Sequence, residues 1–90
     1  MSTFLIGYDL NTSGQNYDGL IKEIKALGSW WHCLDSTWLV KCNSTYVTVR
    51  NHLQQFIDSN DELLVIDVTG DSAAWIGFDD ECANWLRQGL

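Results

Sequence analysis

Asp9 is the first residue of this chain whose type and position suggest chemistry. It follows the apolar run TFLIGY (residues 3–8) and precedes the polar stretch NTSGQN (residues 11–16). A carboxylate at a strand end suits a hard divalent cation, so Mg²⁺ or Mn²⁺ is the ion that would fit Asp9, although nothing in the sequence demands a cofactor. The polar stretch leads into a predicted helix start, where Asn11, Ser13 and backbone N–H groups could hold an anion. The alternative is an Asp that only caps its own loop.

The stretch SWWHCLDSTWLV (residues 29–40) gathers three tryptophans. Aromatic rings stack on nucleic-acid bases with about 1–3 kcal/mol per base, and such stacking needs little positive charge. Successive strand residues point to opposite faces, so Trp30 and Trp31 cannot share one core. We therefore expect one of them to meet an interface or a ligand, with core packing as the alternative for the others.

The histidines and cysteines show no catalytic or metal-binding spacing. His32 is expected to be a hydrogen-bonded structural histidine and His52 to face solvent, and neither has a partner that would make a nucleophilic triad. The cysteines at positions 33, 42 and 82 are odd in number and lack a CxxC pair. They predict reduced thiols in a cytoplasmic protein, without a disulfide framework or a zinc site.

Composition limits the size of the fold and the class of partner. Ninety residues at 46% hydrophobic content predict a single domain spanning 1–90. The net charge of −7 leaves five scattered basic residues, which disfavours long duplex DNA as a partner. The N-terminus lacks the basic start of a signal peptide, and no apolar segment has membrane-spanning length, so no membrane partner is expected.

Periodicity predicts four strands and three helices. The expected strands are residues 3–9, 29–34, 36–42 and 62–68, and the expected helices are residues 17–27, 45–57 and 79–89. Gly28 suits the C-cap of the first helix. The strands around Asp35 and Ser36 should form a tight hairpin. The nearly all-apolar ELLVIDV (residues 62–68) is expected to be a central strand.

This element order predicts an α+β fold of ferredoxin-like type. Its βαββαβ pattern gives one antiparallel sheet with both main helices on one face, followed by an additional C-terminal helix. The other face must then be solvated or covered by something else. A domain of this size is marginally stable alone, so the chain is expected to be a homodimer.

Several short motifs also carry a family resemblance. The Asp that ends the first strand in GYDL and the ST of CLDSTWLV resemble the small CRISPR-associated proteins that form the central dimer of the spacer-integration complex. The chain is similar as well to their SinR-like relatives, in which YDLN, a WW stretch, STWL and a later VTG recur in this order. The resemblance implies a ferredoxin-like homodimer in which Asp9 meets its symmetry mate, with a divalent metal and metal-dependent nuclease activity in some members.

Three functions stay open. The leading one is a non-catalytic homodimeric binding module that holds a nucleotide-like or short nucleic-acid ligand, with sequestration of a small nucleotide signal as one role for such a module. Its expected ligand-binding residues are Tyr8, Asn11, Ser13, Trp31, His32, Ser36 and Trp38. The second is a metal-dependent ribonuclease or phosphodiesterase that uses paired Asp9, although residues 10–19 offer no basic group to stabilise developing charge. The third is a protein-interaction adaptor that docks a partner on the exposed sheet face.

Overall fold

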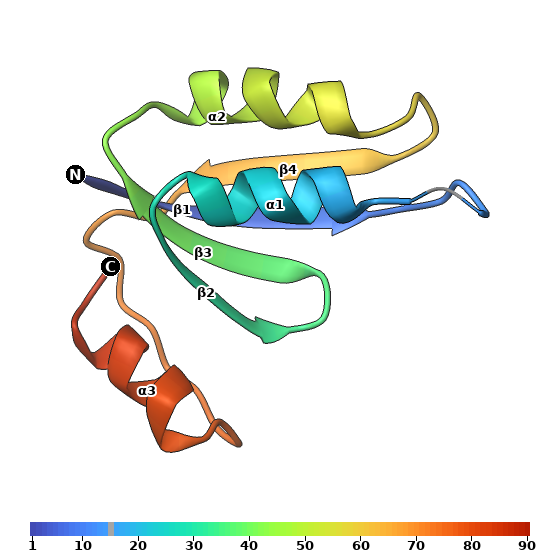
Figure 1. Ribbon diagram of the computed structural model, residues 1–90. Coiled ribbons are helices and arrows are strands. Elements are labelled where there is room, and N and C mark those ends of the chain that lie inside the picture. Colours follow the sequence, from blue (N-terminus) through green and yellow to red (C-terminus); the bar gives the residue numbers. More distant parts are fainter. Residues whose placement is uncertain (15) are drawn as a thin grey trace.

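The chain folds into four strands with helices between and after them in the computed structural model, which describes residues 1–14 and 16–90 (Figure 1). The elements are β1 (Ser2–Asp9), α1 (Asp18–Ala26), β2 (Ser29–Leu34), β3 (Thr37–Cys42), α2 (Tyr46–Leu53), the 3-10 helix η1 (Gln54–Phe56), β4 (Glu62–Asp67) and α3 (Asp80–Arg87). Each predicted element is confirmed as a helix or strand at its predicted place along the sequence. Gln15, part of the predicted polar stretch, lies outside the described residues. None of the helices described is long and apolar enough to cross a membrane.

The four strands form one sheet in the order β2-β3-β1-β4, and neighbouring strands are antiparallel. This α+β arrangement is compatible with a ferredoxin-like fold. The prediction for β4 was wrong, because β4 lies at the edge of the sheet. Its Leu64 and Ile66 are 55% and 42% exposed. A nearly all-apolar strand can therefore be an edge strand, because the residue types do not show whether a neighbouring strand or helix covers it.

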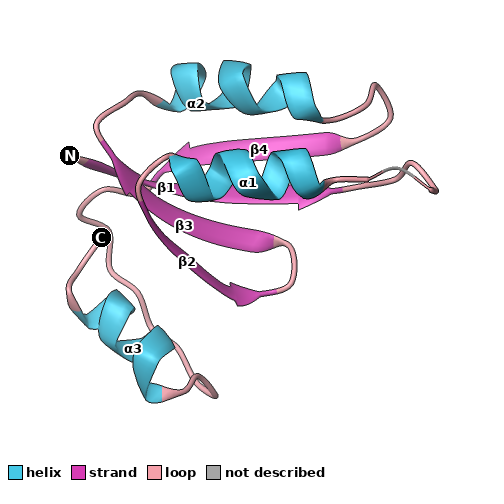
Figure 2. Cartoon of the chain, viewed as in Figure 1, coloured by secondary structure: helices cyan, strands magenta, loops and turns pink. Residues whose placement is uncertain are grey.

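Helices α1 and α2 lie together on one side of the sheet, which we call the helix face (Figure 2). Apolar residues at helical spacing, such as Leu20 and Ile24 of α1, point down onto the strands. Helix α2 begins at Thr45, whose side-chain oxygen accepts a hydrogen bond from the Thr48 amide at 3.2 Å. The main core contains Phe4, Ile6, Leu20, Ile24, Trp38, Val40, Cys42, Val49 and Leu53.

Helix α3 packs on the opposite side of the sheet, which we call the α3 face. It begins at Asp79, whose carboxylate accepts a hydrogen bond from the Cys82 amide at 2.9 Å. Its Leu86 is buried with Trp31 and Leu39 in a second apolar cluster. The Trp31 indole N–H donates to the Cys82 carbonyl at 3.1 Å. The expected partner surface for one of the two adjacent tryptophans is thus supplied within the chain, on the half of the sheet formed by β2 and β3.

The cysteine prediction was wrong. A disulfide joins Cys33 of β2 to Cys82 of α3, two positions separated by 49 residues. Such a long separation leaves no spacing motif, so only the packing of α3 on β2 brings the two thiols together. Cys42, the free cysteine of the described residues, is buried, and its burial raises the pKa of its thiol.

Gly28 has a different role from the predicted helix cap. The C-cap position belongs to Leu27, which keeps a helical backbone. A Cβ on Gly28 would overlap the carbonyl oxygen of Lys41, because the start of β2 passes very close to the end of β3. Only glycine fits such a close approach of two backbones.

Substituting Gly28 by alanine is expected to lower the free energy of unfolding by about 1–3 kcal/mol, because one of the two strands must shift. Chemical denaturation measures this change. Gly19→Ala is the matched control. Gly19 lies in α1, where alanine is the better helix former, and its new Cβ would make an ordinary contact with Phe56 at 3.5 Å. Equal stability of Gly28→Ala and the unmodified protein would mean that the strands do not approach this closely.

Candidate functional site

Three chain segments meet at one end of the sheet, at the right of Figure 1: the end of β1, the β2–β3 turn and the start of β4. Gly7 lies opposite both Thr37 and Leu64, and its missing side chain leaves a depression between them. The result is an open groove of about 360 Å³, which we call the Gly7 groove. Its lining residues are Gly7, Tyr8, Asp9, Ser36, Thr37, Glu62, Leu63 and Leu64. The predicted site residues Tyr8, Asp9 and Ser36 therefore do come together.

The Gly7 groove is acidic at one end, and along the rest the hydroxyl residues Ser36 and Thr37 lie beside the apolar Leu63 and Leu64. Asp9 and Glu62 lie opposite each other in the β1–β4 register, and both are exposed. The lining residues include no basic side chain. Asn11 restrains one of the two carboxylates, because its side-chain N–H₂ donates to Glu62 at 2.9 Å. An acidic end beside an apolar floor suits a group with an apolar body and a positive charge.

A metal ion fits one copy of this chain poorly. Within residues 1–14 and 16–90, no group of three or more His, Cys, Asp or Glu side chains is placed to hold a metal. Asp9 and Glu62 offer two carboxylates, whereas Mg²⁺ demands near-octahedral oxygen coordination that would then be completed largely by water. The metal role of Asp9 therefore stays a prediction that depends on a second copy of the chain.

Asp61 organises the polar loops beside the groove. Its carboxylate accepts hydrogen bonds from the Asn11 amide at 2.7 Å, from the Tyr17 hydroxyl at 2.8 Å and from the Asp58 amide at 2.8 Å. Desolvation acts to raise the pKa of Asp61, but the hydrogen bonds from Asp58, Asn11 and Tyr17 outweigh it and hold the pKa below its usual value. Asn11, predicted to bind a ligand, is thus engaged in joining the segment after β1 to the start of β4.

The lowered pKa of Asp61 gives a pH dependence with a definite sign. The fold favours the carboxylate, so this contribution to stability is fully present above the unfolded-state pKa and is lost as the pH falls through the lower folded-state pKa. Asp61→Asn is expected to be less stable than the unmodified protein at about pH 7, with the difference narrowing towards about pH 2. Denaturation curves across this range measure it. If the two proteins differ in free energy of unfolding by the same amount at every pH, the charge of Asp61 does not stabilise the fold.

Of the three tryptophans considered for stacking, Trp31 and Trp38 are not open to a ligand, whereas Trp30 is 42% exposed. Trp38 is fully buried, and the His32 ring stacks on it at 3.7 Å between centroids. Its indole N–H donates to the Tyr8 hydroxyl at 2.9 Å. Trp31 is only 5% exposed beneath α3. Both rings belong to the core, because α1 and α2 cover the face that carries Trp38 and α3 covers Trp31 on the other face.

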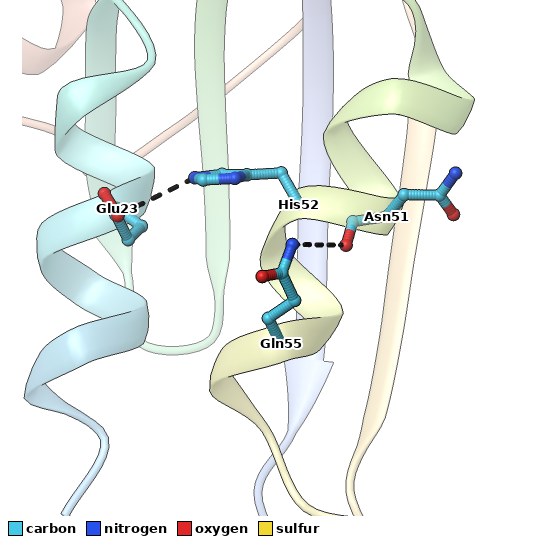
Figure 3. Close-up of polar contacts among 4 residues, drawn as sticks. All are labelled: Glu23, Asn51, His52 and Gln55. Carbon is cyan, nitrogen blue, oxygen red and sulfur yellow. Dashed lines mark hydrogen bonds and ion pairs between the residues drawn. The ribbon is translucent and has the colours of Figure 1, made fainter.

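The remaining predicted residues lie outside the Gly7 groove. The His32 Nε2 lies 3.0 Å from the Asp35 carbonyl oxygen, which confirms it as a hydrogen-bonded structural histidine. Ser13 is exposed in the loop that follows β1. Figure 3 shows His52 of α2 reaching toward Glu23 of α1, with 3.8 Å between the imidazole Nε2 and the carboxylate. Beside it the Gln55 amide donates to the Asn51 carbonyl four residues earlier. The first contact joins α2 to α1 and the second lies within one helical segment, so both have a structural role.

A second groove, of about 240 Å³, crosses the α3 face. Its walls are mostly apolar and include Leu5, Trp31, Leu34, Leu39, Trp75, Ile76 and Phe78. Leu5 lies opposite Ile66 of β4, so this groove adjoins the exposed Leu64 and Ile66. Sequence reasoning missed Glu62, Leu64 and Ile66 because ELLVIDV was interpreted as buried.

No protein-family model matches this chain, and no solved structure matches it.

Proposed function

We propose that this protein is a non-catalytic binding module of ferredoxin-like fold that docks a protein partner on the part of the α3 face formed by β1 and β4. The observation that carries the proposal is the pair Leu64 and Ile66, exposed at 55% and 42% on the edge strand. Leu34 and Ile76, 49% and 93% exposed, extend the same apolar surface. Contiguous exposed apolar surface with a polar rim marks interaction sites on soluble domains.

The charge beside this surface supports a basic partner. Asp9 and Glu62 border it at the Gly7 groove, and the chain as a whole carries a net charge of −7. Opposite charges across an interface steer association and suppress wrong partners. The proposed partner therefore presents apolar side chains together with lysine or arginine.

The other sequence-based functions find less support. A nucleotide would bring phosphates toward Asp9 and Glu62, and the rings of Trp31 and Trp38 are buried. A homodimer through the same surface would bring two acidic rims together, so we propose a different protein as the partner. The Cys33–Cys82 disulfide favours an oxidising compartment, which weighs against the cytoplasmic location expected from the sequence.

The ferredoxin-like part of the proposal is supported by two features of the sheet. The order β2-β3-β1-β4 places β1 between β3 and β4, and each main helix connects two strands that lie parallel with one strand between them. This is the double split βαβ arrangement.

The test titrates the isotope-labelled protein with two lysine-rich apolar peptides, one of helical and one of alternating pattern. Binding should shift the methyl resonances of Leu64 and Ile66, and Ile66→Asp should weaken it about tenfold, as expected for a central contact. Val47→Asp is the matched control, because Val47 is also exposed, at 43%, but lies on α2.

The same titration includes di- and cyclic nucleotides and short RNA with Mn²⁺. If nucleotides are retained, or if RNA is cut and the cutting stops in Asp9→Asn, the protein-binding proposal is replaced by the corresponding alternative. If neither peptide binds and Ile66→Asp behaves like Val47→Asp, the apolar surface is no docking site.

A further inference from the structure

We propose that the partner joins the free edge of β4 as an added β-strand, and that the joining segment alternates apolar residues with lysine or arginine. This inference rests on the proposed function, because it specifies how a protein partner is held. Strand addition at a sheet edge uses backbone hydrogen bonds for affinity and alternate side chains for selectivity.

The hydrogen-bond alternation of the sheet identifies the free groups of β4. The Val68 amide donates to the Thr3 carbonyl at 2.9 Å in the same register as the β1–β4 pairs. In an antiparallel ladder, hydrogen-bonded pairs recur at every second residue. Residues 62, 64 and 66 therefore bond to β1, and the N–H and C=O groups of Leu63, Val65 and Asp67 point away from it.

The two edges of the sheet are protected very differently. Strand β2 has a register shift between Trp31 and Leu34 and is tied to α3 by the disulfide. Strand β4 is regular along all six of its pairs with β1, and it contains neither lysine nor proline. Natural edge strands are usually blunted by bulges, prolines or lysines. The edge at β4, beneath α2 in Figure 1, is therefore the one that can accept a strand.

Charge at the strand ends indicates what kind of strand fits. Glu62 begins β4 on the α3 face, together with Leu64 and Ile66, whereas Asp67 ends it on the helix face. A neighbouring strand that alternates apolar and basic residues would place its apolar side chains beside Leu64 and Ile66 and its basic side chains on the other face, beside Asp67.

A second copy of this chain fits the same edge poorly. Each copy carries a net charge of −7, so two copies repel each other at this edge, and self-pairing centred on Leu64 would also set Asp61 of one copy opposite Asp67 of the other. The occupant is thus an extended, basic segment of another protein.

The experiment measures amide hydrogen exchange by NMR with an acetylated peptide of alternating lysine and valine. Free edge amides exchange fast, so binding should slow exchange at Leu63, Val65 and Asp67 by tenfold or more relative to the protein alone. An alternating glutamate–valine peptide and a block-ordered lysine–valine peptide are the controls, and neither should protect these amides. Asp67→Asn, which removes the carboxylate charge on the face where the lysines would lie, should weaken the binding of the lysine peptide.

Each other outcome overturns the inference. Methyl shifts at Leu64 and Ile66 without protection of the edge amides would mean that the partner docks on the face alone, which leaves the proposed function standing. Equal protection by the glutamate peptide would mean that charge does not select the added strand. Protected edge amides in the protein alone, together with a dimer mass by light scattering, would make a second copy the occupant. The absence of any peptide effect at either the methyls or the edge amides would overturn both proposals.

Discussion

Replacing Cys82 by serine is expected to lower the free energy of unfolding by about 4 kcal/mol at 25 °C, the value that the loop-entropy relation gives for a closed loop of about 50 residues. The Cys33–Cys82 bond closes a loop with a sequence separation of 49, so it restricts more than half of the unfolded chain. The loss is large for a domain of this size, whose total stability is of the order of 5–15 kcal/mol.

Unfolding of Cys82→Ser should begin at α3, because this helix packs on the sheet only through the small second apolar cluster. The buried residues of this cluster are Leu86, Trp31 and Leu39. Two indole hydrogen bonds add to it, from Trp31 to the Cys82 carbonyl at 3.1 Å and from Trp85 to the Ser29 hydroxyl at 3.0 Å. Without the covalent link, α3 can open before the main core unfolds. Hydrogen exchange in Cys82→Ser should therefore accelerate in α3 more than in β1.

Chemical denaturation of four samples measures the effect: the oxidised protein, the protein with a phosphine reductant, Cys82→Ser, and Cys33→Ser combined with Cys82→Ser. The reductant should destabilise only the unmodified protein, and the double variant is the control that has no disulfide to lose. Titration of three free thiols in the unreduced protein, with no effect of reductant on stability, would contradict the bond.

The location of the helices and strands could be predicted because each is encoded locally. In α1, Leu20 and Ile24 repeat at helical spacing, and the hairpin turn at Asp35 and Ser36 separates two runs of strand formers. The position of β4 could also have been predicted. In a βαββαβ sheet of ferredoxin-like type the first strand lies between the third and the fourth, so ELLVIDV had to be an edge despite its apolar composition.

The disulfide and the buried tryptophans could not be predicted, because both depend on contacts between distant segments. Nothing near Cys33 in the sequence indicates that Cys82 will lie beside it. The alternation of strand β3 placed Trp38 on one face with Val40, but it did not say that α1 and α2 would exclude a ligand from that face. Of the predicted site residues, Tyr8, Asp9 and Ser36 line the Gly7 groove. The sequence analysis missed Leu64 and Ile66, because their exposure depends on the folded sheet.

Substituting Trp38 by alanine is expected to cost about 3–5 kcal/mol, because the side chain is fully buried and its removal leaves a cavity in the main core. The ring lies between the sheet and α1 and α2, and His32 stacks on it at 3.7 Å between centroids. Trp38→Phe keeps most of the apolar volume and should cost less. Both variants should alter stability and leave the Leu64–Ile66 surface unchanged, since that surface lies on the other side of the sheet.

The hydrogen bond between Trp38 and Tyr8 makes this prediction specific to a core role. The indole N–H donates to the Tyr8 hydroxyl at 2.9 Å, so Trp38→Phe and Tyr8→Phe should not be additive: their coupling energy should be about 1 kcal/mol. Denaturation of both single variants and the double variant measures it, with Trp30→Phe, a 42% exposed position on the same face, as the control. A ligand-stacking role predicts the reverse, namely unchanged stability on losing Trp38 and a loss of binding. If Trp38→Ala proves as stable as Trp30→Phe, the ring is not part of the core, and the nucleotide-binding interpretation regains its platform.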